Sequence, residues 1–167
     1  MFVSYSFDLR FRRLYNCRRM NKSETAAVLM VEHRMNCTQS VLSVFCQEFK
    51  LNRNQALRIA MGFGGGMGRT GKTCGAVTGA YMVLGLSQRL NENNARESIE
   101  RTYILVQEFN KKFKELNGSI ICKELIKYDL NSPEGLAEAR SNAVFSTVCP
   151  KLVSDAVKVL ETILPTY

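Results

Sequence analysis

The residues of this chain that could carry chemistry are its six cysteines, Cys17, Cys37, Cys46, Cys74, Cys122 and Cys149. We expect the protein to be cytoplasmic, because its N-terminus lacks the apolar core and cleavage site of a secretory signal. In a reducing compartment a scaffold of disulfides is not expected, so the cysteines indicate metal binding or redox chemistry. No CxxC or CxxH pair occurs, which disfavours zinc-finger-like and thioredoxin-like sites.

Four of these cysteines are predicted to lie at helix starts. Cys37, Cys74 and Cys149 each begin a predicted helix, and Cys122 lies in the first turn after Ser119. The unpaired N–H groups and partial positive charge of a helix N-terminus favour the thiolate. With cationic neighbours, this setting can lower a cysteine pKa from about 8.5 to roughly 3.5–7.5. The cationic residues beside the four cysteines are Arg34, Arg69, Lys72, Lys123 and Lys151.

Thiolates gathered in one place would repel one another unless a metal or cluster held them together, or unless they formed disulfides. The other two cysteines have different predicted roles. Cys46 lies between Phe45 and Phe49 on an apolar stripe, where a small buried hydrophobic residue is expected. Cys17 lies in the N-terminal segment and has no expected role in the site. His33, the single histidine, is predicted to lie on a helix surface and not to be a ligand.

Residues 61–86 hold the densest concentration of glycine, since nine of the eleven glycines fall between Gly62 and Gly85. Glycine is costly inside regular elements, so this cluster predicts a loop that needs positive φ angles or close approach of another chain segment. The apolar run 76–86, which follows Cys74, then predicts a helix that is apolar on nearly all sides and therefore buried.

The same loop contains GMGRTGKT at residues 66–73, which matches the phosphate-binding pattern GxxxxGK[ST]. In that pattern backbone N–H groups and a lysine, here Lys72, contact phosphates. The pattern needs a strand before the loop, whereas residues 54–61 predict a helix. Nucleotide binding is therefore a less favoured hypothesis.

Apolar residues recur at helical spacing along the chain, and strand patterns fail throughout. We predict an all-α fold, a compact single-domain bundle of about six helices with a central buried helix after the glycine-rich loop. The first helix is predicted to be capped by Ser23, and the last is predicted to follow Cys149 and Pro150. The longest is predicted over residues 95–116, with an inward stripe of Ile99, Tyr103, Val106, Phe109, Phe113 and Leu116.

The formal net charge is +8, and residues 1–20 supply half of it. We expect residues 1–19 to be an N-terminal extension, either disordered or the product of an upstream start. Residues 20–167 are expected to form a helical four-cysteine redox domain. The remaining charge is that of a solvated surface, so no nucleic-acid partner is expected. No direct membrane insertion is expected either, because no apolar run reaches the roughly 20 residues of a membrane span.

Several segments together resemble a known family. They are NCTQSV at 36–41, GGGMGR at 64–69, CGAVTG at 74–79, CKEL at 122–125 and Cys149. From about residue 20 to the C-terminus, the sequence is similar to the redox-active proteins named for a C_GCAxxG_C_C signature. A similar module occurs in some multihaem cytochromes that also carry an iron–sulfur cluster. The resemblance also implies an electron-transfer partner, associated with a membrane transporter. The chain has no CxxCH haem-attachment motif.

Two functional hypotheses use the same thiols. In the first, Cys37, Cys74, Cys122 and Cys149 converge to bind an iron–sulfur cluster or another thiolate-bound metal for electron transfer or sensing. Gly75, Ala76 and Gly79 would then bind the cofactor through N–H···S contacts and close packing. In the second, the protein is a thiol–disulfide oxidoreductase in which Cys74 is the nucleophile.

Overall fold

The computed structural model describes residues 20–88 and 95–164, and every element named in these two ranges is a helix. A single β-bridge, between Thr73 and Ile121, is the extended pairing identified in the same residues. The predicted all-α class is therefore confirmed. Cys17 and the expected N-terminal extension lie outside the described residues. The helices are α2 (Lys22–Glu32), α3 (Cys37–Ser43), α4 (Arg53–Ala60), η1 (Met61–Phe63), α5 (Gly64–Met67), α6 (Gly75–Leu86), α7 (Ala95–Asn117), α8 (Cys122–Ile126), α9 (Pro133–Ser141) and α10 (Val144–Ile163).

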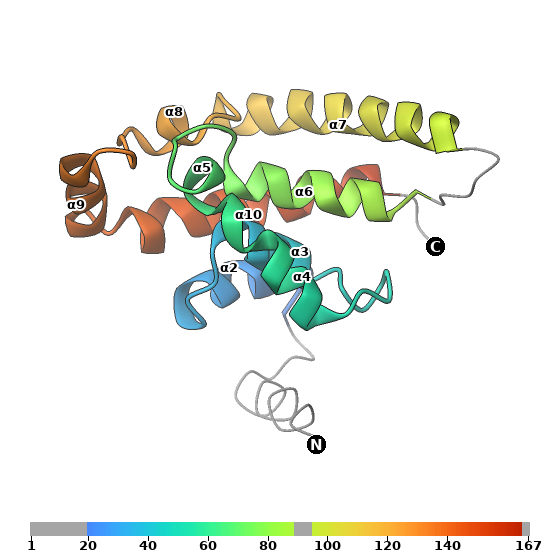
Figure 1. The fold of residues 1–167 in the computed structure, drawn as a ribbon, viewed down its shortest axis with the longest axis horizontal. Helices are drawn as coiled ribbons and strands as arrows, with labels where there is room; N and C mark the ends of the chain where they lie inside the picture. Colours follow the sequence, from blue (N-terminus) through green and yellow to red (C-terminus); the bar gives the residue numbers. More distant parts are fainter. Residues whose placement is uncertain (1–19, 89–94, 165–167) are drawn as a thin grey trace, which may run out of the picture.

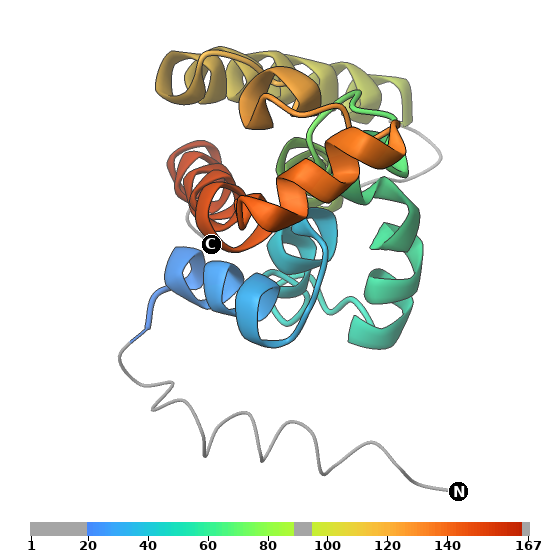
Figure 2. The ribbon, with the colours of Figure 1, turned by 90° about the vertical axis from the view of Figure 1, so that its left-hand side faces the viewer.

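The helices lie in layers, with α7 along one side, α6 and α10 in the middle, and α2, α3 and α4 on the other side (Figure 1). The end-on view in Figure 2 shows α10 between α7 and α2, with α9 beside one end of the stack. The short helices η1, α5 and α8 flank the glycine loop and account for the difference from the expected number of about six. These short elements position the cysteines.

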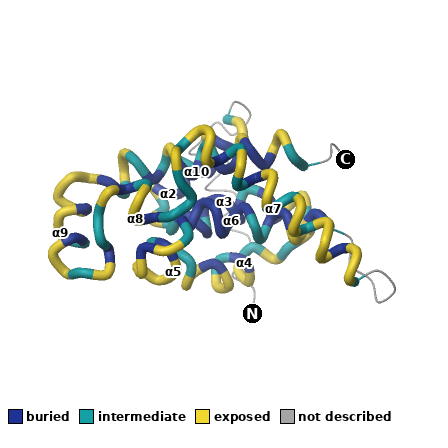
Figure 3. Tube along the Cα trace, turned by 90° about the horizontal axis from the view of Figure 1, so that it is seen from above, coloured by how far each residue is buried: buried dark blue, intermediate teal, exposed yellow. Residues whose placement is uncertain are grey.

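Helix α6 is the buried centre that the sequence predicts. Most of its residues are inaccessible to solvent, and the middle of the molecule is the most deeply buried part of the trace in Figure 3. A Cβ added at Gly75 would lie 2.9 Å from Thr38 Oγ1, and one at Gly79 would lie 2.9 Å from Val41 Cβ. The two glycines therefore let α6 pack directly against α3. The Thr38 and Thr78 hydroxyls meet 3.2 Å apart at this contact.

Helices α2 and α3 both begin with a reciprocal capping box, which satisfies their first N–H groups. In α2 the box joins Asn21 and Glu24, so the cap is Asn21 and not the predicted Ser23. In α3 it joins Asn36 and Gln39, which makes Cys37 the first helical residue, as predicted.

Helix α7 matches its predicted range, but its apolar stripe is only partly covered. Phe109 and Phe113 are fully buried, whereas Ile99, Tyr103 and Leu116 are 46%, 57% and 60% exposed. The helix has 23 residues and α6 has 12, so α7 is longer than its neighbour by about 16 Å. Burial on α7 therefore depends on how far the neighbouring helices extend along it, and not on the apolar stripe alone.

The predicted start of the last helix after Pro150 is wrong. Helix α10 begins at Val144 and contains Pro150 in its interior, so Cys149 lies within a helix and not at its start. An interior proline removes one helical hydrogen bond and costs about 3 kcal/mol. Burial of the apolar face of α10 offsets this cost, since each fully buried large aliphatic side chain contributes about 1.5–3 kcal/mol. The buried face comprises Val144, Cys149, Leu152, Val153, Ala156, Val157, Val159 and Leu160.

Among the residues that the structure describes, no helix combines the length and the hydropathy needed to cross a membrane.

Candidate functional site

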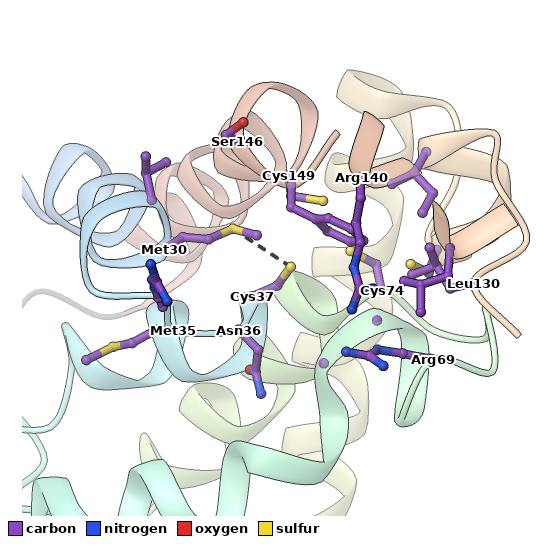
Figure 4. A pocket seen from close by; sticks show the side chains of 18 of the residues that line it. Met30, Met35, Asn36, Cys37, Arg69, Cys74, Leu130, Arg140, Ser146 and Cys149 are labelled. Carbon is purple, nitrogen blue, oxygen red and sulfur yellow. Dashed lines mark hydrogen bonds between the residues drawn. The ribbon is translucent and has the colours of Figure 1, made fainter. Parts of the chain in front are cut away.

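All four predicted site cysteines line one cavity of about 1150 Å³, although they come from α3, the start of α6, α8 and α10. Each is buried, with 1–7% of its surface exposed. Figure 4 shows the Cys37, Cys74 and Cys149 side chains around this space. The structure thus brings together residues separated by up to 112 positions, from Cys37 to Cys149.

The position of Cys37 is fixed from both sides of its helix start. The Asn36 side chain, which caps α3, also donates to the backbone carbonyl of Met61 at 3.0 Å. The Gln39 amide donates to the carbonyl of Leu57 at 2.9 Å. These bonds attach the start of α3 to α4 and η1. The Cys37 thiol then points to the Sδ atom of Met30, 4.0 Å away.

Cys74 and Cys122 are brought together by backbone pairing between the glycine loop and the segment before α8. The N–H of Cys74 donates to Ile120 at 2.8 Å, and the N–H of Cys122 donates to Lys72 at 2.7 Å. Gly66 allows this close approach, because a Cβ there would lie 2.6 Å from Cys122 Cβ. The glycine loop therefore seats Cys122 beside Cys74.

Cys149 reaches the cavity from α10, and its thiol lies close enough to Cys37 to interact with it electrostatically. Since α10 packs against α2, α3 and α6, this contact joins the last helix to the first cysteine of the site. The sequence analysis assigned Cys149 to the site because Cys149 was predicted to begin a helix. That reason is wrong, since α10 continues through Pro150.

Burial reverses the expected acidity of these thiols. Desolvation raises the pKa of Cys74 to about 12, although the backbone amides of Ala76 and Val77 act to lower it. Desolvation also raises the pKa of Cys122 to about 12, with added repulsion from Cys74 and Cys37. The interaction with the Cys149 thiol, followed by burial, raises the pKa of Cys37 well above its usual range. The prediction of a lowered pKa is therefore wrong for Cys37, Cys74 and Cys122, because burial of these thiols outweighs the effect of the helix N-termini.

These pKa values predict that the reduced, metal-free protein loses stability in alkali. The folded state holds the Cys74 and Cys122 protons up to about pH 12, whereas an unfolded thiol loses its proton near about pH 8.5. The free energy of unfolding should be insensitive to these thiols below that pH and fall above it, by on the order of 1 kcal/mol per pH unit for each thiol. Urea unfolding measured from neutral pH to about pH 10 checks this. Cys74→Ala should show a shallower decline, and identical slopes in both proteins would contradict the assignment.

The four thiols are neighbours but not a closed ligand shell. Across residues 20–88 and 95–164, no three histidine, cysteine or carboxylate side chains are grouped closely enough to hold a metal ion. The five cysteines of this part of the chain are all free thiols. Around one tetrahedral ion, thiolate sulfurs lie about 3.8 Å apart, given a metal–sulfur distance of about 2.3 Å. The donor chemistry therefore fits a thiophilic group, whereas the spacing does not fit a single ion without movement.

The remaining predicted residues lie outside the cavity lining. Gly75 and Gly79 pack against α3, and Ala76 contributes its amide to Cys74, so cofactor binding by these three stays a prediction. Cys46 is buried in the core, as expected for a small hydrophobic residue, but in the turns that follow α3. His33 caps the end of α2 and does not line the cavity.

The glycine loop differs from a phosphate-binding loop. It follows α4 and η1 and not a strand, and it contains α5. Its amides bond within the loop: Gly68 donates to Gly64 at 2.9 Å and Lys72 donates to Gly66 at 3.1 Å. Amides used in this way are not directed at a ligand, so the loop geometry supports packing beside Cys122 and not nucleotide binding.

Sequence reasoning missed a charged residue of the cavity. Arg34 and Arg69 were expected beside the cysteines, but Arg140 also lines the cavity. It lies in the last turn of α9, nine positions before Cys149. If the last helix had been predicted to continue through Pro150, α9 would have been expected to lie beside Cys149.

Comparison with known proteins adds a family and one relative. The model of the family described as "Putative redox-active protein (C_GCAxxG_C_C)" matches residues 35–163. An "Uncharacterized protein" of Archaeoglobus fulgidus is 26% identical over 111 residues, which cover 62% of this chain and 74% of that protein. No solved structure matches. Since the family match covers most of the chain and includes all four cavity cysteines, this chain belongs to the C_GCAxxG_C_C family of redox-active proteins.

Proposed function

We propose that Cys37, Cys74, Cys122 and Cys149 hold an iron–sulfur cluster, or another thiophilic centre of more than one metal ion, for electron transfer or sensing. The observation that carries this proposal is the convergence of four buried thiols from four segments on one cavity. When bound, such a cluster supplies reversible electron transfer at thiolate-bound iron. A cluster distributes its cysteine ligands over several metal ions, so it accepts wider sulfur spacing than one ion does.

The residues around the thiols have defined tasks in this proposal. Burial excludes water from the sulfurs, and the Ala76 and Val77 amides direct partial positive charge at Cys74. Amides of this kind stabilise a thiolate and shift the potential of a bound centre. Because the raised pKa values of Cys37, Cys74 and Cys122 keep these thiols protonated at neutral pH, loading would release protons. An electron-transfer partner in the cytoplasm, associated with a membrane transporter, completes the proposal.

Metal analysis and a visible spectrum of the anaerobically purified protein test the proposal. We expect iron and acid-labile sulfide in the folded protein, with the absorption of sulfur-to-iron charge transfer. A folded, colourless protein without metal, which also fails to take up iron and sulfide under reducing conditions, would contradict it.

The proximity of the Cys37 and Cys149 thiols, which interact in the same cavity, favours a second candidate function, thiol–disulfide exchange. In this scheme one of the two thiols, as its thiolate, attacks a partner disulfide and releases one partner thiol. The other thiol then displaces the mixed disulfide, so the partner leaves as a dithiol and Cys37–Cys149 becomes the disulfide. Cys74 is a poor nucleophile in this conformation, because it is 1% exposed and its pKa is raised to about 12.

Mild oxidation of the metal-free protein distinguishes the two functions. The exchange function predicts that glutathione disulfide removes two thiols and that peptide mapping finds Cys37 linked to Cys149. Full retention of the free thiols after this treatment excludes the exchange function. Cys46→Ser serves as the control, since Cys46 lies outside the cavity.

A further inference from the structure

The lining of the four-cysteine cavity carries positive charge without compensating negative charge. It includes Arg34, Arg69 and Arg140, and it contains no aspartate or glutamate. All three arginines are exposed, so their side chains are available to solvent at the cavity opening. In the described part of the chain, none of them takes part in an ion pair. A concave surface of one charge sign concentrates counter-ions.

The backbone holds two of these arginines under local strain. Arg34 and Arg69 have φ angles of 53° and 69°, in the left-handed region that side chains rarely adopt, and Ala143 of the same lining has 54°. Such conformations cost about 1–3 kcal/mol each and concentrate at functional sites. At Gly65, an added Cβ would lie 3.0 Å from Arg69 Cγ and 3.5 Å from Leu130 Cδ1. The aliphatic part of the Arg69 side chain therefore packs over the backbone of Gly65, next to Leu130.

Two of the arginines converge. Figure 4 shows Arg140 extending from α9 toward Arg69, so that both guanidinium groups lie on the Cys74 side of the cavity. Like charges directed at each other without a carboxylate between them repel. An anion placed between them would remove this repulsion and accept paired N–H bonds, which is the geometry that guanidinium offers to carboxylates and oxyanions.

The rest of the lining is largely apolar. Besides the cysteines, it includes Met30, Met35, Ile126, Leu130, Leu136 and Phe145. An apolar wall with a few convergent polar groups, in a cavity of about 1150 Å³, is typical of a small-molecule site. We propose that Arg69 and Arg140 bind the carboxylate or oxyanion group of a small molecule whose apolar body lies in the cavity toward the cysteines.

As a substrate site this proposal rests on the proposed redox function, because the bound molecule would lie beside the redox-active thiols. Anion binding itself requires neither a cluster nor a disulfide, so it can be measured on the reduced, metal-free protein. The same experiment separates a site for a small molecule with an apolar body from arginines that only attract negative charge, since such arginines would bind phosphate at least as well as benzoate.

The test uses benzoate, uncharged benzamide of the same shape, and inorganic phosphate at constant ionic strength. Binding is followed by amide chemical shifts and by protection of the thiols from alkylation. We expect benzoate to bind at least about 10-fold more tightly than benzamide, and Arg69→Gln or Arg140→Gln to weaken benzoate by at least about 10-fold. Arg58→Gln is the matched control, since Arg58 is exposed on α4 and outside the cavity.

Equal binding of benzoate and benzamide, or equal binding by the Arg69, Arg140 and Arg58 variants, would overturn the proposal. Binding of phosphate without benzoate would overturn the part that concerns the apolar body. If no small anion binds the metal-free protein while an acidic protein partner does, the arginines form a docking surface and the small-molecule site is wrong. A colourless protein that still binds benzoate through these arginines would refute the cluster and leave the anion site standing.

Discussion

Replacing any one of the four cavity cysteines with serine is expected to abolish the iron–sulfur absorption of the anaerobically purified protein. Cys74→Ser and Cys122→Ser test the pair positioned by the glycine loop, and Cys37→Ser and Cys149→Ser test the pair contributed by α3 and α10. Each substitution removes a thiolate that serine cannot replace as a soft ligand. Iron content per folded chain, determined beside the spectrum, measures the loss.

Cys46→Ser is the control for this series, because Cys46 is equally buried but lies outside the cavity lining. It should reduce stability modestly, since it places a hydroxyl in the core, and it should retain full iron content. The assignment would be contradicted if Cys46→Ser lost the chromophore or if two of the four cavity variants kept it. Circular dichroism confirms that each variant remains helical, so loss of iron is not loss of fold.

Gly66→Ala is expected to have the largest effect among substitutions in the glycine loop. Gly66 is buried at φ 69°, and an added Cβ would lie 2.6 Å from Cys122 Cβ and 2.8 Å from the backbone nitrogen of Lys72. The left-handed conformation costs alanine about 1–2 kcal/mol, and forced packing costs about 1–3 kcal/mol more. We therefore expect a loss of about 2–5 kcal/mol in urea unfolding, together with impaired iron loading, because relief of the clash displaces Cys122.

Substitutions at two other glycines distinguish the cost of the left-handed conformation from the cost of the packing clash. Gly118 has φ 83° and open space around it, so Gly118→Ala should cost only the conformational part. Gly85 lies in α6 with open space and no positive φ, so Gly85→Ala should be neutral or stabilising by up to about 1 kcal/mol. If Gly66→Ala cost no more than Gly118→Ala and loaded iron normally, the loop would not position Cys122.

The sequence predicted the helical class, the buried α6 and the start of α3, because each of these depends on local signals. Periodicity, capping residues and glycine clusters act within a few positions, and α3 begins at Cys37 as expected, with Asn36 as its cap. Asn36 also illustrates the limit, since its bond to the Met61 carbonyl depends on a neighbour 25 positions away. Such contacts decide how the cysteines are held, and spacing alone does not show them.

The errors also have a common cause, which is tertiary burial. Pro150 is a local signal against a helix, but the apolar face of α10 keeps the helix intact around it. The start of α6 is a local signal for an acidic thiol, but desolvation raises the pKa of Cys74 to about 12. On α7, Ile99 continues the apolar stripe and remains exposed. In each case the surroundings of the residue, and not its sequence neighbours, determine the outcome.

X-ray absorption at the iron edge of the anaerobically purified protein tests the four-cysteine centre most directly, because it reports the atoms that surround the metal. The proposal predicts a shell made entirely of sulfur at about 2.3 Å, with an iron neighbour beyond it. A shell dominated by nitrogen or oxygen would contradict the centre that we propose.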